Sequence, residues 1–334
     1  MPLKLNRREL RQTVFVGVIA LLTFSSAFGQ SAQESEDARA KDMRQMWKNV
    51  VKRRPQRPVK IARVTTTAKN HRPQTPQPEY KITSSTIPAQ GQDLGITVWR
   101  LRPSRTADAK EIRQEIPTKR LRHKPNNMAE GTIFLTAERV EAGTQLHEGD
   151  LIQLSVESPQ KGFLYVIDRE RYADANRVTY GAPYLIFPTT RTNKGFNGVR
   201  PGILINIPAM TDDPFYFELN RSNDHHVAEE LTFVVSPTPI TWQGEQEKDT
   251  KQIKLDERQF EDLAKQMMAE TGRIELAGGA GKAQTAEEAE AAKASSSDGA
   301  KRLKHKDPLP QTIYRVARKP REPFIITILL RIAA

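Results

Sequence analysis

Four acidic and amide side chains lie close together in one short segment and form the best candidate for chemistry. They are Asp168, Glu170, Asp174 and Asn176. Dense oxygen ligands of this kind suit calcium, but Ala173 stands where the calcium-binding EF-hand loop requires glycine. A pair of these carboxylates could also serve a glycoside hydrolase, although a sequence does not fix their separation. We therefore interpret the four residues as a candidate binding site and assign neither a metal nor a catalytic residue.

A second cluster combines histidine with acid. The run Asp224-His225-His226 is followed by Glu229-Glu230. Adjacent histidine side chains tend to diverge, and the H-E-x-x-H spacing of zinc proteases is missing, so we expect a solvated loop here. The chain has no cysteine, which excludes disulfides, thiolate-bound metals and thiol catalysis. No other motif predicts a cofactor.

Alternating apolar and polar residues from Leu94 onward predict the elements that must position these side chains. Residues 151–157 alternate regularly, which is typical of a half-buried strand. The turn-forming residues 158–162 predict a hairpin that pairs this strand with residues 163–167. Further strand candidates are residues 96–102, 133–135, 184–187, 203–207, 215–219, 231–235, 313–316 and 324–332. The fold class predicted is all-β with one accessory helix, as an antiparallel β-sandwich or a partly closed barrel.

The accessory helix is predicted at residues 256–271. Asp256 is a good N-cap, and the apolar residues that follow recur at helical spacing up to a stop at Thr271-Gly272. Residues 278–306 are rich in Gly, Ala, Glu and Ser, and we expect them to be a disordered insertion. The β-rich domain then comprises residues 94–277, and strands in residues 307–334 complete it.

The N-terminal residues predict export. Basic residues precede an apolar run from Thr13 to about Phe24, and small residues follow up to Gly29. This is the three-part pattern of a secretory signal peptide, over residues 1–29. We expect cleavage, with no membrane span left afterwards, although retention as an anchor stays open. The expected location is the periplasm or the extracellular space.

A basic, proline-rich stalk is predicted between the signal peptide and the domain. Residues 30–93 begin with a short amphipathic helix and continue as a disordered linker. From Lys41 to Pro125 there are 21 Lys and Arg against 6 Asp and Glu, so the chain's positive charge is concentrated here. Such a block either keeps a linker extended or attracts polyanions. The candidate polyanion contacts are Arg53, Arg54, Arg57, Lys119, Arg120 and Arg122. Nucleic acid is not the expected partner, because no aromatic residues are interleaved between Lys52 and Arg72 and we expect the chain to be exported.

Several motifs together carry a family resemblance over roughly residues 94–240. They include Gly95-Ile96-Thr97-Val98-Trp99-Arg100, Gly162-Phe163-Leu164-Tyr165-Val166-Ile167-Asp168-Arg169-Glu170 and Pro183-Tyr184-Leu185-Ile186-Phe187-Pro188-Thr189. The chain resembles a bacterial exported family known as the domain of unknown function number forty-three eighty-four. That resemblance implies a β-rich module, often joined to other domains, and implies no activity or catalytic residue.

Taken together, these features predict an exported, non-enzymatic binding module of the bacterial cell envelope. Its partner would be a protein or an envelope polymer, including an anionic one. Two alternatives stay open. One is an envelope-glycan hydrolase, or another extracytoplasmic enzyme, that uses the segment from Asp168 to Asp174. The other is a structural component of the envelope.

Overall fold

The computed structural model describes residues 80–82, 87–108, 113–117, 120–121, 131–175, 177–246, 252–293, 303 and 307–333. The predicted signal peptide, the short helix and the stalk up to residue 79 lie outside this part. Within it the chain is mostly β, and its strands form two separate sheets. The predicted all-β class is therefore confirmed, and the two-sheet arrangement corresponds to the sandwich form.

The first sheet, sheet A, is built around the long strand β2. Its main path runs β1-β16-β17-β2-β4-β3, β6 pairs along the other side of β2, and β11 and β12 pair with β6. All of its pairings are antiparallel. The bounds are β1 Tyr80–Ile82, β2 Gln92–Pro103, β3 Arg113–Pro117, β4 Thr132–Val140, β6 Leu151–Glu157, β11 Leu204–Ile207, β12 Phe217–Glu218, β16 Thr271–Leu276 and β17 Thr312–Val316.

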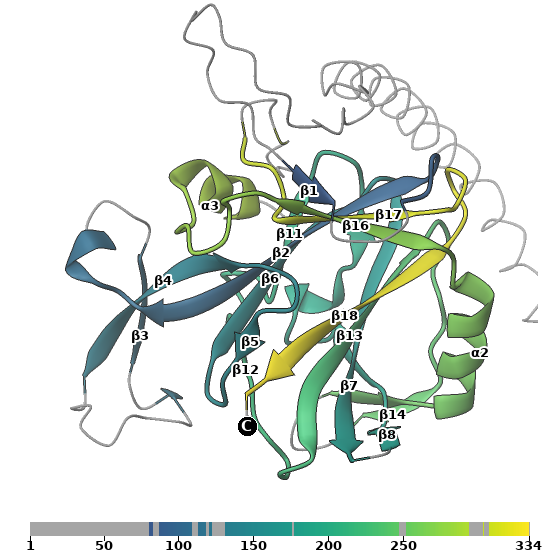
Figure 1. Ribbon diagram of the computed structural model, residues 1–334, viewed down its shortest axis with the longest axis horizontal. Helices are drawn as coiled ribbons and strands as arrows, with labels where there is room; N and C mark the ends of the chain where they lie inside the picture. The colour runs from purple at the N-terminus through teal and green to yellow at the C-terminus, as the bar shows by residue number, and fades with distance from the viewer. Residues whose placement is uncertain are drawn as a thin grey trace, which may run out of the picture. The chain divides into compact units, whose positions relative to one another are not determined.

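The second sheet, sheet B, runs in the order β14-β15-β9-β7-β13-β18-β5, and β8 and β10 also pair with β7. Its pairings are antiparallel except for the short parallel pair of β18 with β5. The bounds are β5 Gln145–Leu146, β7 Gly162–Asp174, β8 Arg177–Tyr180, β9 Tyr184–Phe187, β10 Gly198–Val199, β13 His226–Ser236, β14 Gly244–Gln246, β15 Ile253–Leu255 and β18 Phe324–Ile332. Figure 1 shows β7, β13 and β18 running side by side below the strands of sheet A.

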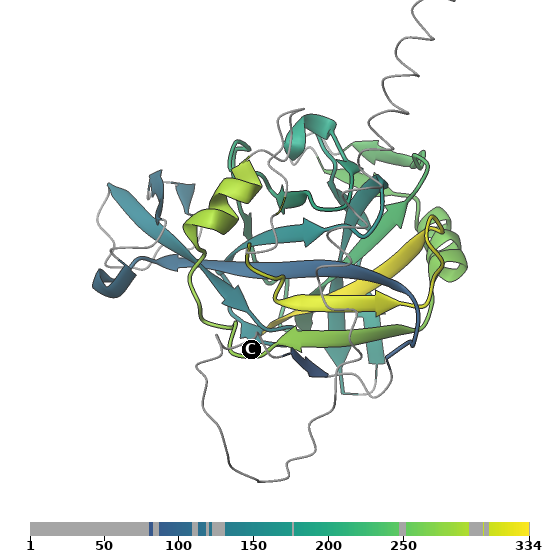
Figure 2. The same ribbon diagram turned by 90° about the horizontal axis from the view of Figure 1, so that it is seen from above.

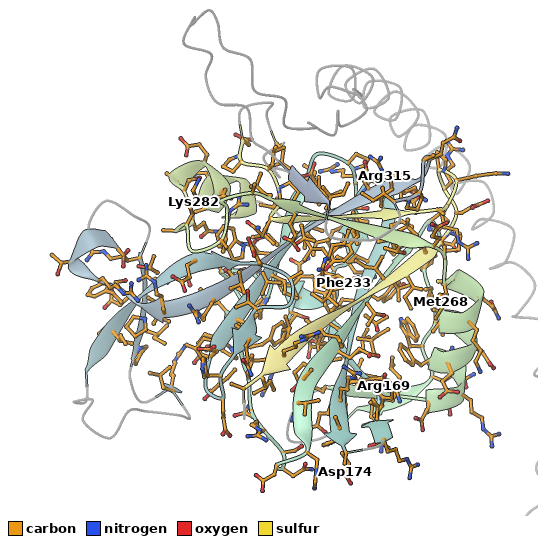
Figure 3. All side chains as sticks on the ribbon, viewed as in Figure 1. Arg169, Asp174, Phe233, Met268, Lys282 and Arg315 are labelled. Carbon is orange, nitrogen blue, oxygen red and sulfur yellow. The ribbon has the colours of Figure 1, made fainter. Side chains whose placement is uncertain are left out.

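The main hydrophobic core lies between the two sheets. Ile96 and Leu154 of sheet A and Phe233 and Ile326 of sheet B belong to one buried cluster. Phe233 is fully buried and lies near the centre of the view in Figure 3. Each such side chain contributes about 1.5–3 kcal/mol when it leaves water, so the alternating apolar residues stabilise the sandwich.

The helix α2, Glu257–Met267, covers the opposite face of sheet B (Figure 1). The predicted N-cap is confirmed, because the Asp256 side chain accepts a hydrogen bond from the Gln259 amide at 2.8 Å. Phe260 packs with Tyr165 and Ile167 of β7. The predicted end of the helix is wrong, since α2 stops at Met267 and Thr271 begins β16.

The predicted hairpin at residues 158–162 is also wrong. Strand β6 belongs to sheet A and β7 to sheet B, so this loop carries the chain from one layer to the other. Gly162 is required at the start of β7 because the backbone of β13 comes very close to it. A Cβ atom there would lie 2.2 Å from the Ser236 carbonyl oxygen, so the close approach of β13 excludes any side chain.

Two segments expected to be disordered are ordered in part. The last part of the predicted stalk forms β1, which pairs with β16. In the predicted insertion, residues 281–284 hydrogen-bond to β4, and residues Ala286–Lys293 form the helix α3. Figure 2 shows α3 beside β2. The expectation of disorder is therefore wrong for residues 278–293, and most of residues 294–306 lie outside the described part.

Candidate functional site

Strand pairing brings the two predicted acidic clusters together. Asp168 and Glu170 lie on the same face of β7, and Glu229 of β13 stands directly opposite Glu170. This face continues into the core between the sheets, so the carboxylates lie at the end of the sandwich interior. One carboxylate oxygen each of Asp168 and Glu229 is enclosed and has no hydrogen-bond partner among the described residues.

His226 closes the same cluster from the start of β13. Its side chain is fully buried, with Nε2 at 3.6 Å from Glu229 and Nδ1 at 3.9 Å from Glu170. The Ser222 amide donates to Nδ1 at 3.3 Å, and Nε2 lies 3.1 Å from the Ala228 carbonyl oxygen. The expectation of a solvated loop is therefore wrong for His226.

The surroundings of the cluster raise the pKa values of Asp168 and His226, so both groups keep their protons to higher pH. Burial raises the pKa of Asp168 well above its usual value, and the nearby charges of Glu229 and Glu170 raise it further. Burial alone would lower the pKa of His226, but its interactions with Glu229 and Glu170 outweigh burial and raise it. The arrangement therefore favours a protonated Asp168 beside two further carboxyl groups, and acid–base chemistry can use a group of this kind.

The other predicted site residues do not join this cluster. Asp174 is exposed at the tip of the β7–β8 hairpin, where it accepts the Ala175 amide at 2.7 Å (Figure 3). Asn176 lies outside the described residues. The described residues contain no group of three or more His, Cys, Asp or Glu side chains that could hold a metal ion.

The candidate polyanion contacts are described at one position only. Arg120 is exposed and pairs with Asp213 at 2.6 Å. The remaining contacts lie outside the described residues, namely Arg53, Arg54, Arg57, Lys119 and Arg122.

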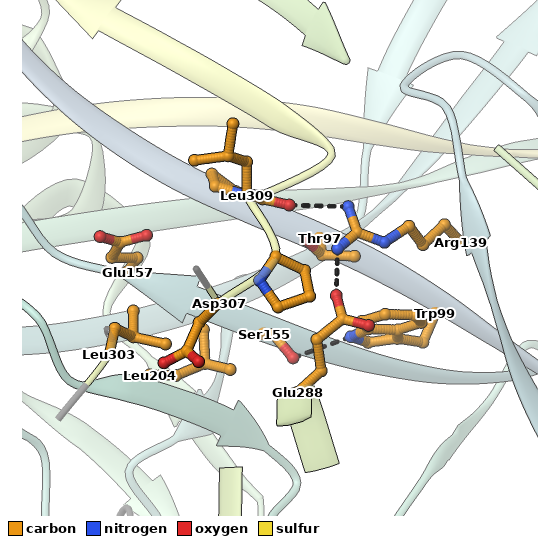
Figure 4. Close-up of a pocket in the computed structure, with 12 residues that line it drawn as sticks. Thr97, Trp99, Arg139, Ser155, Glu157, Leu204, Glu288, Leu303, Asp307 and Leu309 are labelled. Carbon is orange, nitrogen blue, oxygen red and sulfur yellow. Dashed lines mark hydrogen bonds and ion pairs between the residues drawn. The ribbon is translucent and has the colours of Figure 1, made fainter. Parts of the chain in front are cut away.

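A polar site lies on the face of sheet A that is turned away from sheet B. Arg139 pairs with Glu288 of α3, donates to the Leu309 carbonyl oxygen at 2.8 Å and stacks 5.2 Å from the centre of the Trp99 ring. The Trp99 indole in turn donates to Ser155 at 2.8 Å. Figure 4 shows these groups around a cavity of about 20 Å³, which has room for about one water molecule. Arg139 is buried, and its ion pair with Glu288 attaches α3 to sheet A.

A second cavity lies between the two sheets. It has a volume of about 200 Å³ and is bordered by β2, β16 and β17 on one side and by β18 on the other. Exposed residues of the turn 141–144 form part of its rim, so the cavity opens to solvent. Its floor consists of the core residues Ile96, Val98, Val140, Ile328 and Leu330.

Tyr314 of β17 supplies a polar group inside this apolar cavity. Its side chain is only 6 % exposed and lines the cavity, and its hydroxyl forms no hydrogen bond with another described residue. Burial and the nearby charge of Glu275 raise the pKa of Tyr314, so the hydroxyl keeps its proton at neutral pH. This hydroxyl faces the cavity as a hydrogen-bond donor, and an acceptor atom of a ligand could bind to it.

Charged groups flank the same cavity. Arg273 lies beside Tyr314 across the β16–β17 pair, with its guanidinium 3.8 Å from the Glu275 carboxylate. Glu275 is buried, accepts from Thr312 at 3.1 Å and accepts from the Ala142 amide at 3.3 Å. Burial raises the pKa of Glu275. The carboxylate thereby ties the rim of the cavity to the sheet.

The sequence did not predict this cavity or Tyr314 as a site residue. The alternation in residues 313–316 indicates only that Tyr314 faces a core. Nothing local to the residue indicates that the opposing strand β18 leaves a space beside it. By contrast, the sequence predicted Asp168 and Glu170 as candidate site residues, but it did not predict that Glu229 and His226 would join them.

The fold and the cavity define the class of the described part as a two-layered β-sandwich with a solvent-open cavity between its sheets. No family model, curated protein or solved structure matches the chain. None of the described helices has the length and apolar character that crossing a bilayer requires.

Proposed function

We propose that this protein is an exported binding module of the bacterial cell envelope that works by binding a partner rather than by catalysis. Its partner is a protein or an envelope polymer, part of which enters the cavity between the sheets. The basic stalk steers an anionic partner toward the domain and gives the domain reach. The predicted signal peptide and the family resemblance support the proposed location.

The observation that carries this proposal is the Tyr314 side chain, which lines the solvent-open cavity and has no hydrogen-bond partner among the described residues. Binding sites for small groups are concave and mainly apolar, with a few polar atoms that fix orientation. The cavity has these features, and its wall is made from strands of both sheets. A wall of paired strands is already in place before a ligand arrives, which lowers the entropy cost of binding.

Affinity capture from envelope extract tests the proposal. The full-length exported protein is compared with a Val98→Phe variant, which fills the floor of the cavity, and a Val178→Phe variant at an exposed position on β8. We expect the first variant to lose the captured partner and the second to retain it. Equal capture by both variants would show that the partner does not use the cavity.

A second candidate function is an envelope-glycan hydrolase. The observation that favours it is the pairing of Asp168, whose pKa is raised, with the neighbouring Glu229. In this case Asp168→Asn would lower the rate of hydrolysis of an envelope glycan by orders of magnitude. The binding module, by contrast, should capture its partner equally well with this substitution, because Asp168 is not among the residues that line the cavity.

A further inference from the structure

The size of the inter-sheet cavity limits what can enter it. Its volume of about 200 Å³ exceeds the roughly 150 Å³ of an engineered apolar cavity that holds benzene. One ring or one branched aliphatic group therefore fits, together with one or two further heavy atoms. A longer chain would have to extend past the turn 141–144 into solvent.

The walls disfavour a charged ligand group. The floor is aliphatic, so a charged group would lose its hydration without a matching partner there. The charged residues that line the cavity are Glu141, Arg273 and Arg331, and Glu275 lies 3.8 Å from Arg273. An anion and a cation would therefore each meet a like charge near the opening. These opposing charges offset one another, which leaves an uncharged group as the best match.

Tyr314 adds one requirement for hydrogen bonding. The hydroxyl is protonated at neutral pH and has no partner among the described residues, so it is available as a donor. A ligand with one suitably placed oxygen could therefore accept a hydrogen bond from Tyr314 inside an otherwise apolar cavity.

We infer that the cavity binds one uncharged, mainly apolar group of about ring size that carries a single acceptor oxygen, held by the Tyr314 hydroxyl. This inference rests on the proposed function and names the class of ligand group for the same site. An aromatic or branched aliphatic group next to a hydroxyl or carbonyl oxygen fits this description. The rest of the partner then lies outside the sandwich.

Three probes with the same ring and different charge test this inference. The full-length protein is titrated with benzyl alcohol, benzoate and benzylamine, and the amide signals of β2, β17 and β18 are followed by NMR. Benzyl alcohol should shift signals next to Val98 and Tyr314 and bind at least about tenfold more tightly than either charged probe. Binding of benzoate or benzylamine as tight as that of benzyl alcohol would overturn the uncharged class, and shifts only elsewhere would overturn the site.

Two conservative variants separate the hydrogen bond from packing. Tyr314→Phe removes only the hydroxyl and should weaken the binding of benzyl alcohol by about two- to tenfold. Tyr180→Phe, at an exposed position on β8, should leave the affinity for benzyl alcohol unchanged. Unchanged affinity in Tyr314→Phe would refute the role of the hydroxyl. If none of the probes binds but Val98→Phe still loses the captured partner, the ligand class is wrong and the binding function stands. If both experiments fail, the proposed function fails with it.

Discussion

At the scale of single residues, the acidic cluster is the feature whose protonation depends most on neighbouring groups. Asp168, Glu170 and Glu229 face one another from β7 and β13, with His226 buried beside them. Burial and like charge both favour the protonated form of Asp168. The folded protein therefore binds more protons here than the unfolded chain does.

This proton uptake gives a prediction about stability and pH. Because the folded-state pKa of Asp168 is raised, the free energy of unfolding should fall as pH rises from about 4, the ordinary value, through that raised pKa. The raised pKa of His226 acts with the same sign from about pH 6.5 upward. Asp168→Asn should remove most of the first effect, so the variant should be more stable than the natural protein at pH 7 and similar to it at pH 3.

Chemical denaturation across this pH range measures the effect. Asp174→Asn is the matched control, because Asp174 lies on the same strand but is exposed at the hairpin tip. Its stability should follow that of the natural protein at every pH. Identical pH profiles of the free energy of unfolding for the two variants would refute the raised pKa of Asp168.

At the scale of elements, the sequence predicts strands well and their partners poorly. Alternation identifies β6, and its apolar residues face the core as expected. The polar residues Gln153 and Ser155 on the other face are buried too, because the segment carrying α3 and the loop after β11 cover them. The composition of residues 278–306 does not indicate that this segment packs on sheet A, because the segment has almost no large apolar residues. One glutamate, Glu288, and a few backbone hydrogen bonds hold it there.

The ion pair between Arg139 and Glu288 is therefore expected to hold α3 in place. Arg139 is 6 % exposed, so Glu288→Ala leaves a buried cation without its carboxylate. We expect a loss of about 3–5 kcal/mol in the free energy of unfolding, measured by urea denaturation. The control Glu287→Ala changes an exposed residue of the same helix and should cost less than about 1 kcal/mol. Equal losses would mean that the pair contributes nothing specific.

At the scale of the whole molecule, the cavity shows what sequence patterns cannot supply. The local sequence pattern predicts a strand residue that faces a core at each of Val98, Tyr314 and Leu330. They meet around one space only because of the way β2 and β17 of sheet A face β18 of sheet B. That relation depends on how two layers pack, which period-two alternation does not encode. The fold class was therefore predictable and the cavity was not.

A crystal structure of the full-length protein with the partner that it captures tests most directly whether the cavity is the binding site. We predict that an uncharged group of this partner lies between the sheets, with an acceptor oxygen within hydrogen-bond distance of the Tyr314 hydroxyl. A partner bound only at the acidic cluster, on α2 or along the stalk, with the cavity empty, would contradict it.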